Sequence, residues 1–152
     1  MDPSSSVAQN QQLEPETYHL VLKNKRDQLD RLSEWINQVS SQLHLSSRGA
    51  FRLELSLVEA VTNVIEHAYQ DEADHEITLV LNAMKQTVRV EIKDDGQPFN
   101  PLQHPPIVLP TSLEEAKEGG LGIHLIRNYV NEWLYQREGP YNILTLLIHD
   151  VD

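Results

Sequence analysis

The pattern of hydrophobic and polar residues is most regular between Glu54 and Gln70, where apolar residues recur every three to four positions. This period predicts an α-helix with one broad apolar face, because successive residues of a helix are turned by about 100°. The predicted apolar face comprises Leu53, Leu57, Ala60, Val61, Val64, Ile65 and Ala68. The opposite face is lined by Glu59, Asn63, Glu66 and Gln70, spaced by four, three and four residues. We therefore expect a helix that packs on a sheet and holds a carboxylate and a carboxamide one turn apart.

Before and after this helix, the pattern changes between the period of a strand and that of a helix. The predicted elements are a strand at 17–22, a helix at 29–43, strands at 77–81 and 88–92, a helix from 123 to about 131, and strands at 133–137 and 142–149. Ser46 or Ser47 is the expected N-cap of the helix that contains Glu59. Trp35 and Trp133 occupy apolar positions and are predicted to lie in the core. The order of elements predicts an α+β fold: a two-layer α/β sandwich with helices on one face of a mixed, mostly antiparallel sheet.

Two segments fall outside this pattern. Residues 1–14 are polar and rich in Ser and Gln, and we expect a disordered N-terminal tail. Residues 97–118 hold five of the chain's eight prolines, which disfavour both regular helix and central strand. A long irregular segment inside a compact domain is typical of a functional loop, so 97–118 is predicted to be a lid. Residues 15–152 are expected to form a single domain.

The charge and composition narrow the classes of function. A net charge of −11, from 12 Lys and Arg against 23 Asp and Glu, argues against direct binding of nucleic acid or of an anionic membrane. A phosphate-bearing ligand is still allowed, because magnesium and backbone N–H groups bind phosphate without a positive protein charge. The absence of Cys excludes disulfides and thiolate metal sites. No apolar run approaches about 18 residues and the start lacks the features of a signal peptide, so we expect a cytoplasmic protein.

Three short motifs carry candidate chemistry. On the predicted helix, the carboxylate of Glu59 suits a general base and the amide oxygen of Asn63 suits magnesium. Asp94-Asp95-Gly96 ends a predicted strand, where a carboxylate beside a glycine can accept a hydrogen bond from an exocyclic amine. Gly119-Gly120-Leu121-Gly122 opens the next helix, whose N–H groups attract phosphate oxygens. Taken singly, these motifs more often belong to a solvated helix face, an Asp-Gly turn and a hinge.

Together and in this order, the motifs resemble those of the histidine-kinase-like (GHKL) ATPase superfamily. They are most similar to one branch of it, the bacterial anti-sigma factor serine-protein kinases. The matching segments are Glu59-Ala60-Val61-Thr62-Asn63 with His67-Ala68-Tyr69, then Asp94 to Pro101, then Glu118 to Ile123. The resemblance covers roughly residues 16 to 150 and implies the Bergerat ATP-binding fold.

The resemblance also implies a role for each matching residue. Glu59 stands where the family has its catalytic base, and Asn63 where it has a ligand to Mg²⁺. Asp94 matches the residue that binds the amino group of adenine, and Gly96 makes room beside the base. The other residues expected to contact ATP are His67, Lys117, Gly119, Gly120, Leu121 and Gly122.

The family's activity sets the expected function. Its members transfer the γ-phosphate of ATP to a Ser or Thr of a small STAS-domain anti-anti-sigma protein, and alternately hold a sigma factor away from RNA polymerase. The resemblance therefore implies a protein serine/threonine kinase that uses ATP and Mg²⁺, releases ADP and has these two protein partners. A homodimer is expected from the family alone.

The sequence departs from the family pattern in three places. Glu118 stands where some members carry a basic residue that meets the γ-phosphate, with Lys117 beside it. The last strand of the family often carries a Gly-Thr pair near the adenine, which has no clear counterpart in residues 141–145, and the predicted lid is unusually rich in Pro. Glu118 keeps open an alternative, a non-catalytic nucleotide-binding module that switches between partners. The catalytic domain of a sensor histidine kinase is less favoured, because the chain has no room for the dimerising helix pair that carries the phosphorylated His.

Overall fold

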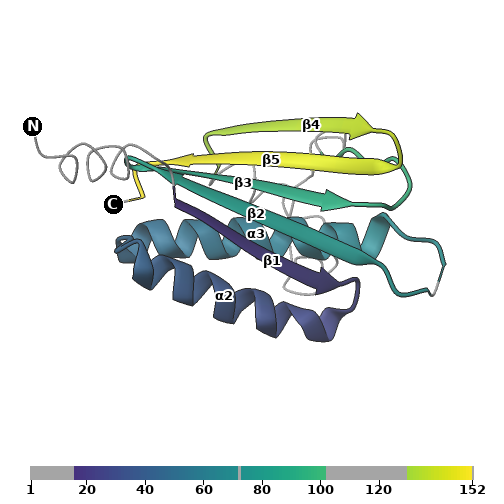
Figure 1. The fold of residues 1–152 in the computed structure, drawn as a ribbon, viewed down its shortest axis with the longest axis horizontal. Coiled ribbons are helices and arrows are strands. Elements are labelled where there is room, and N and C mark those ends of the chain that lie inside the picture. Colours follow the sequence, from purple (N-terminus) through teal and green to yellow (C-terminus); the bar gives the residue numbers. More distant parts are fainter. Residues whose placement is uncertain (1–15, 72, 102–129, 152) are drawn as a thin grey trace, which may run out of the picture.

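Five strands form one sheet in the computed structural model, which describes residues 16–71, 73–101 and 130–151 (Figure 1). The strand order is β1-β2-β3-β5-β4, and every neighbouring pair is antiparallel. The strands are β1 (Glu16–Lys23), β2 (Glu76–Met84), β3 (Thr87–Asp94), β4 (Glu132–Glu138) and β5 (Tyr141–His149). The predicted fold class is confirmed, although the described strands contain none of the parallel pairing that a mixed sheet has.

Two α-helices, α2 (Leu29–Gln42) and α3 (Ser47–His67), lie on one face of the sheet (Figure 1). A 3-10 turn, η1 (Arg26–Gln28), links β1 to α2. Helix α3 begins where the sequence predicts, because the Ser46 hydroxyl accepts a hydrogen bond from the Gly49 N–H at 2.9 Å and so caps the helix.

The C-terminal end of α3 differs from the prediction. The helix ends at His67, three residues before Gln70. The carbonyls of His67 and Ala68 accept hydrogen bonds from the side chain and the backbone N–H of Gln97, at 2.9 and 2.8 Å. A further helical turn would use these carbonyls internally, so the contact with the segment after β3 replaces it.

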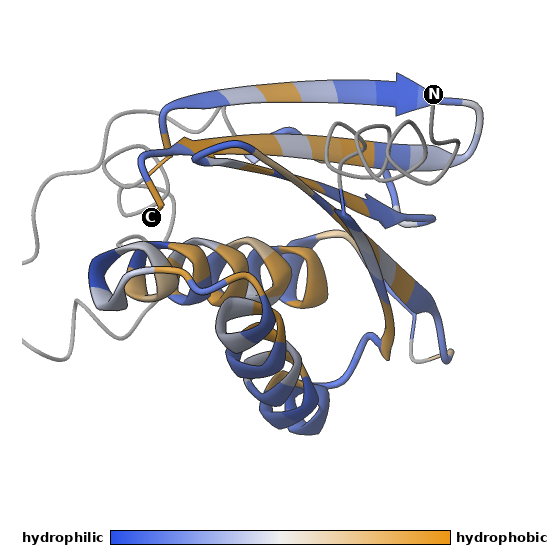
Figure 2. Ribbon diagram, turned by 60° about the vertical axis from the view of Figure 1, so that its left-hand side comes forward, coloured by the Kyte–Doolittle hydropathy of each residue, from blue (hydrophilic) through white to orange (hydrophobic). Residues whose placement is uncertain are grey.

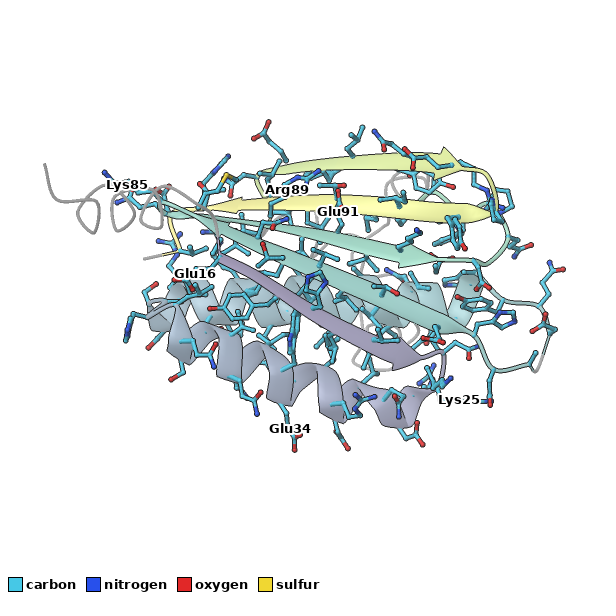
Figure 3. All side chains as sticks on the ribbon, in the orientation of Figure 1. Glu16, Lys25, Glu34, Lys85, Arg89 and Glu91 are labelled. Atoms are coloured by element: carbon cyan, nitrogen blue, oxygen red, sulfur yellow. The ribbon has the colours of Figure 1, made fainter. Side chains whose placement is uncertain are left out.

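The core lies between the two helices and the inner face of the sheet. Figure 2 shows the apolar residues of α2 and α3 on the side toward the sheet. The predicted apolar face of α3 is buried except for Ile65, which is partly buried. On β3, Val88, Val90 and Ile92 face this core, while Arg89 and Glu91 lie on the outer face and form an ion pair at 2.8 Å (Figure 3). Each fully buried Val or Leu contributes roughly 1.5–3 kcal/mol relative to exposure, so the alternation fixes which face of β3 points inward.

The prediction for Trp133 is wrong. Trp35 packs against the core as expected, but Trp133 is 36% exposed. Trp133 lies on β4, the edge strand of the sheet, most of whose side chains are exposed. Alternation along the sequence does not reveal which strand will form an edge, and an edge strand has a packing neighbour on one side only.

Several predicted features lie outside the described residues. They are the tail at 1–14, most of the lid at 97–118 and most of the helix expected after Gly122. Within the part of the chain that the structure describes, no helix is long and apolar enough to cross a membrane.

Candidate functional site

The turn after β3 meets the C-terminal end of α3. Gly96 lies so close to α3 that a Cβ atom placed on it would be 2.4 Å from the carbonyl oxygen of Ala68. Real Cβ atoms do not approach backbone this closely, so the position admits only glycine without a shift of the backbone. The structure thus joins two of the three motifs, the Asp94-Asp95-Gly96 turn and the helix that carries Glu59, at one edge of the sheet.

Asp94 is the last residue of β3, and it is buried at 4% exposure. Its Oδ1 atom accepts hydrogen bonds from the Gly96 N–H and from Nδ2 of Asn142, both at 2.9 Å. The described residues donate nothing to its Oδ2 atom. Burial raises the pKa of Asp94, while the two hydrogen bonds act in the opposite direction. One carboxylate oxygen is thus held by the protein, and the other is available to accept a hydrogen bond from a ligand.

Asn63 is buried on α3 at 3% exposure, although the pattern along the helix places it on the polar face opposite the apolar one. Its Nδ2 atom has no hydrogen-bond partner within the described ranges. A buried NH₂ donor without a partner is costly, so this group points to a ligand that accepts a hydrogen bond from it. The amide fits the expected magnesium site in kind, because its oxygen is a hard ligand suited to that ion.

Glu59 lies one helical turn before Asn63 on α3 and is half-buried. Burial raises the pKa of Glu59, and the negative charge of Glu66 raises it further. The Glu66 carboxylate is itself paired with the guanidinium of Arg26. A carboxylate with a raised pKa is a stronger base, which suits the proton-accepting role predicted for Glu59.

His67 lies at the end of the same helix and beside the turn after β3. Its imidazole stacks on the ring of Phe99, with 5.2 Å between the ring centroids. The structure therefore places His67 beside the segment that follows Gly96, with its carbonyl bonded to the Gln97 side chain. Its contact with ATP remains a prediction.

The remaining predicted ATP contacts lie outside the described residues. They are Lys117, Gly119, Gly120, Leu121 and Gly122. Glu118, the residue that departs from the family pattern, lies outside them as well.

Asn142, the residue that holds Asp94, is not among the site residues predicted from the sequence. Asn142 pairs with Asp94 across the β3–β5 ladder and is 3% exposed. Its position carried a signal, because Asn142 has the same strand parity as Leu144 and Leu146, which face the core. A polar residue at an inward strand position needs hydrogen-bond partners, and here one of them is a candidate ligand-binding carboxylate. Arg137, on β4, is likewise not among the predicted site residues, and it donates to the Gly96 carbonyl at 2.8 Å.

His75 anchors the loop between α3 and β2 beside the Asp94-Asp95-Gly96 turn. Its ring stacks on Tyr69 at 4.4 Å, and its Nε2 and Nδ1 atoms lie 2.7 Å from Asp71 and 3.2 Å from Asp95. The hydrogen bond to Asp71 is the main cause that raises the pKa of His75, and Asp95 adds to it. Protonated His75 therefore stabilises the fold.

This arrangement predicts a pH-dependent contribution to stability. The stabilisation by His75 is full below the ordinary pKa of 6.5 and is lost as the pH rises through the higher folded value. His75→Gln is expected to lower the melting temperature by about 1–3 °C at about pH 6, and by less at about pH 9. The matched control is His19→Gln on the exposed side of β1, a substitution that should leave the melting temperature unchanged. A melting-temperature deficit of His75→Gln that does not shrink as the pH rises would contradict the assignment.

The chain belongs to the histidine kinase-like ATPase domain family, whose model matches residues 22–148. Among characterised proteins, it is 32% identical over 115 residues to the serine/threonine-protein kinase BtrW of Bordetella bronchiseptica, covering 76% of this chain and 81% of the relative. It is 29% identical over 139 residues to the serine-protein kinase RsbW of Listeria innocua, covering 88% of this chain and 87% of the relative.

The fold is also similar to a solved structure, that of the RsbU and RsbW domains of Rv1364c from Mycobacterium tuberculosis. The TM-score is 0.63 at 14% identity, and the match covers 88% of this chain. It covers 32% of the solved chain, so this protein corresponds to about a third of that length. At this identity the likeness supports the fold alone.

Proposed function

We propose that this protein is an ATP-dependent protein serine/threonine kinase and anti-sigma factor. The observation that carries the proposal is the pair on α3: a half-buried Glu59 with a raised pKa, one turn from a buried Asn63 whose Nδ2 atom has no partner among the described residues. Membership of the ATPase family and similarity to proteins named serine-protein kinases support it.

In the proposed reaction, Glu59 accepts the proton of a Ser or Thr hydroxyl on a protein partner. As the hydroxyl oxygen bonds to the γ-phosphorus of ATP, the bond from that phosphorus to the bridging oxygen breaks and ADP leaves. Asn63 is the residue that would hold Mg²⁺, which when bound offsets the phosphate charge. Asp94 would bind the amino group of adenine through Oδ2, the oxygen to which no described residue donates.

The partners follow from the same proposal. We infer that the phosphorylated partner is a STAS-domain anti-anti-sigma protein and that the unphosphorylated form competes with a sigma factor for this kinase. Support comes from the relatives' names only in a general way, since they specify a serine-protein kinase. The expectations of a homodimer and of a cytoplasmic location stay predictions.

The test is phosphoryl transfer to a candidate STAS-domain partner from the same organism. After incubation with γ-labelled ATP and Mg²⁺, we expect label on a Ser or Thr of that protein, located by mass spectrometry. The same protein with that residue changed to Ala is the control and should stay unlabelled. If ATP binds and the partner is captured but no label moves, the kinase proposal fails.

That outcome would favour the second candidate, a non-catalytic nucleotide-binding module that switches partners. Glu118 is the observation behind it, because a carboxylate in place of a basic residue near the γ-phosphate would not stabilise the charge of the transition state. For this module, exchanging ATP for ADP should still change which partner is captured.

A further inference from the structure

Asn142 makes more hydrogen bonds than its place at the start of β5 requires. Nδ2 donates to Oδ1 of Asp94 at 2.9 Å and to the carbonyl of Gln97 at 2.8 Å. Oδ1 accepts from the N–H of Phe99 at 3.3 Å and from the hydroxyl of Tyr135. A carboxamide offers two donors and two acceptor positions, so all four are used.

These partners fix the orientation of the amide. If it were turned over, its oxygen would face the Asp94 carboxylate and the Gln97 carbonyl, both acceptors, and its NH₂ would face the N–H of Phe99, a donor. Because Asn142 is buried at 3% exposure, water does not relieve such a mismatch. The amide therefore presents a donor to Asp94 in every arrangement that satisfies its neighbours.

The consequence for Asp94 is that its two oxygens become unequal. Among the described residues, both donors that reach it, the Asn142 amide and the Gly96 N–H, bind Oδ1. Oδ2 is left as an acceptor with a defined direction, because the Asp94 carboxylate cannot rotate without losing two hydrogen bonds. The same amide holds the backbone of Gln97 and Phe99, so the carboxylate and the chain immediately after Gly96 are fixed as one unit.

We propose that Asn142 is a positioning residue that orients Asp94 as a one-sided acceptor and so makes the site select a purine with an exocyclic amine over one with a carbonyl. Adenine offers an N–H donor where hypoxanthine and guanine have an oxygen acceptor. An ionised, fixed Oδ2 binds the donor and repels the acceptor. This inference rests on the proposed binding of adenine by Asp94.

A second consequence concerns the charge of Asp94. Burial raises its pKa, and the hydrogen bond from Asn142 is the largest influence that lowers it. Without that donor the pKa rises further, so Asp94 becomes protonated at a higher pH. A protonated carboxyl donates a hydrogen bond, which a base carbonyl accepts and an amine does not.

The experiment measures the affinity of the full chain for ATP and for inosine triphosphate, whose base has a carbonyl in place of the amine. We expect Asn142→Leu, which has similar volume and no hydrogen bonds, to weaken ATP binding about tenfold or more and inosine triphosphate binding less than about threefold. The pH below which ATP affinity falls should rise, because the hydrogen bond from Asn142 lowers the pKa of Asp94. Asn82→Leu is the same change on the outer face of β2. It should alter neither the ratio of the affinities for ATP and inosine triphosphate nor the pH dependence of ATP binding.

Asn142→Thr keeps one hydroxyl donor for Asp94 and suits a strand, so it provides a second variant if Asn142→Leu does not fold. Its preference for ATP over inosine triphosphate should be reduced but not abolished, so ATP should still bind more tightly than inosine triphosphate. A purely structural role would weaken both nucleotides equally and leave the pH profile in place, and that result overturns the inference.

Asp94→Asn separates the two levels of the proposal. If Asp94→Asn removes selectivity while both Asn142 variants retain it, the role of Asn142 is wrong and the proposed function stands. If Asp94→Asn binds ATP like the unmodified chain, then Asp94 does not bind adenine and the role of Asn142 is wrong as well, while transfer of label to the partner still tests the kinase proposal.

Discussion

Replacing Glu59 with glutamine is expected to slow phosphoryl transfer at least about a hundredfold, while ATP affinity changes less than about threefold. The physical reason is that the glutamine amide keeps the shape of the side chain but accepts no proton from the partner's hydroxyl, and positioned bases typically contribute roughly 10²–10⁴-fold. The measurement is the single-turnover rate of label transfer to the STAS-domain partner beside a separate ATP-binding titration. Glu54→Gln, the same change on the same helix, is the matched control and should transfer label at the unmodified rate.

The pH profile of that rate gives an independent check. A general base acts only when ionised, so the rate should fall as the pH drops through the pKa of Glu59. Because burial and Glu66 raise that pKa, the fall should occur at a higher pH than the ordinary value of 4.5 predicts. Glu66→Gln removes one cause and should move the fall to lower pH. A Glu59→Gln variant that transfers label at the unmodified rate would exclude Glu59 as the base.

Asp94→Asn is expected to weaken ATP binding about ten- to a hundredfold, the equivalent of losing one charged hydrogen bond of about 1.5–3 kcal/mol. The Gly96 N–H and the Asn142 amide both donate toward this side chain, so the oxygen of the introduced amide will turn to them. The NH₂ group of that amide then faces the amino group of adenine, donor against donor. Inosine triphosphate should lose less affinity than ATP, because its carbonyl accepts from that NH₂ group.

The neighbouring aspartate provides the control for this prediction. Asp95 bonds with Tyr69 and His75 instead of with the Gly96 turn. Asp95→Asn should therefore change the affinity for ATP less than about threefold. Equal losses in the Asp94 and Asp95 variants would indicate a general effect of charge in place of a specific contact with the base.

Most of the fold could be predicted because its elements are amphipathic and joined by short connections. The apolar residues of helix α3 recur with the period of a helix and so lie on one face, and Ser46 caps the helix in the expected place. The β2–β3 hairpin follows from two alternating strands separated by a tight turn. The end of α3 was predicted less well, because the bonds from Gln97 that stop it come from a segment about thirty residues away.

The candidate site was predicted in its types of residue but not in its environment. The sequence places Glu59 and Asn63 one turn apart, and assigns them to a polar face. The structure instead buries Asn63 and half-buries Glu59, which changes the carboxylate from a solvated group into one with a raised pKa. Local spacing determines which side chains share a helix face, whereas their solvation depends on what packs over that face.

The sequence by itself determined the helix of Glu59 and the strand that ends in Asp94, whereas the need for glycine at position 96 comes from its tertiary contact with the Ala68 carbonyl. The helix and the strand depend on local periodicity and backbone conformation, which neighbouring residues set. Only the tertiary structure decided that Asn142 lies opposite Asp94, that Trp133 is on an edge strand and that His67 meets the turn after β3. Strand order and register bring together residues that are far apart in the chain, and the alternation within a single strand carries no information about its neighbour.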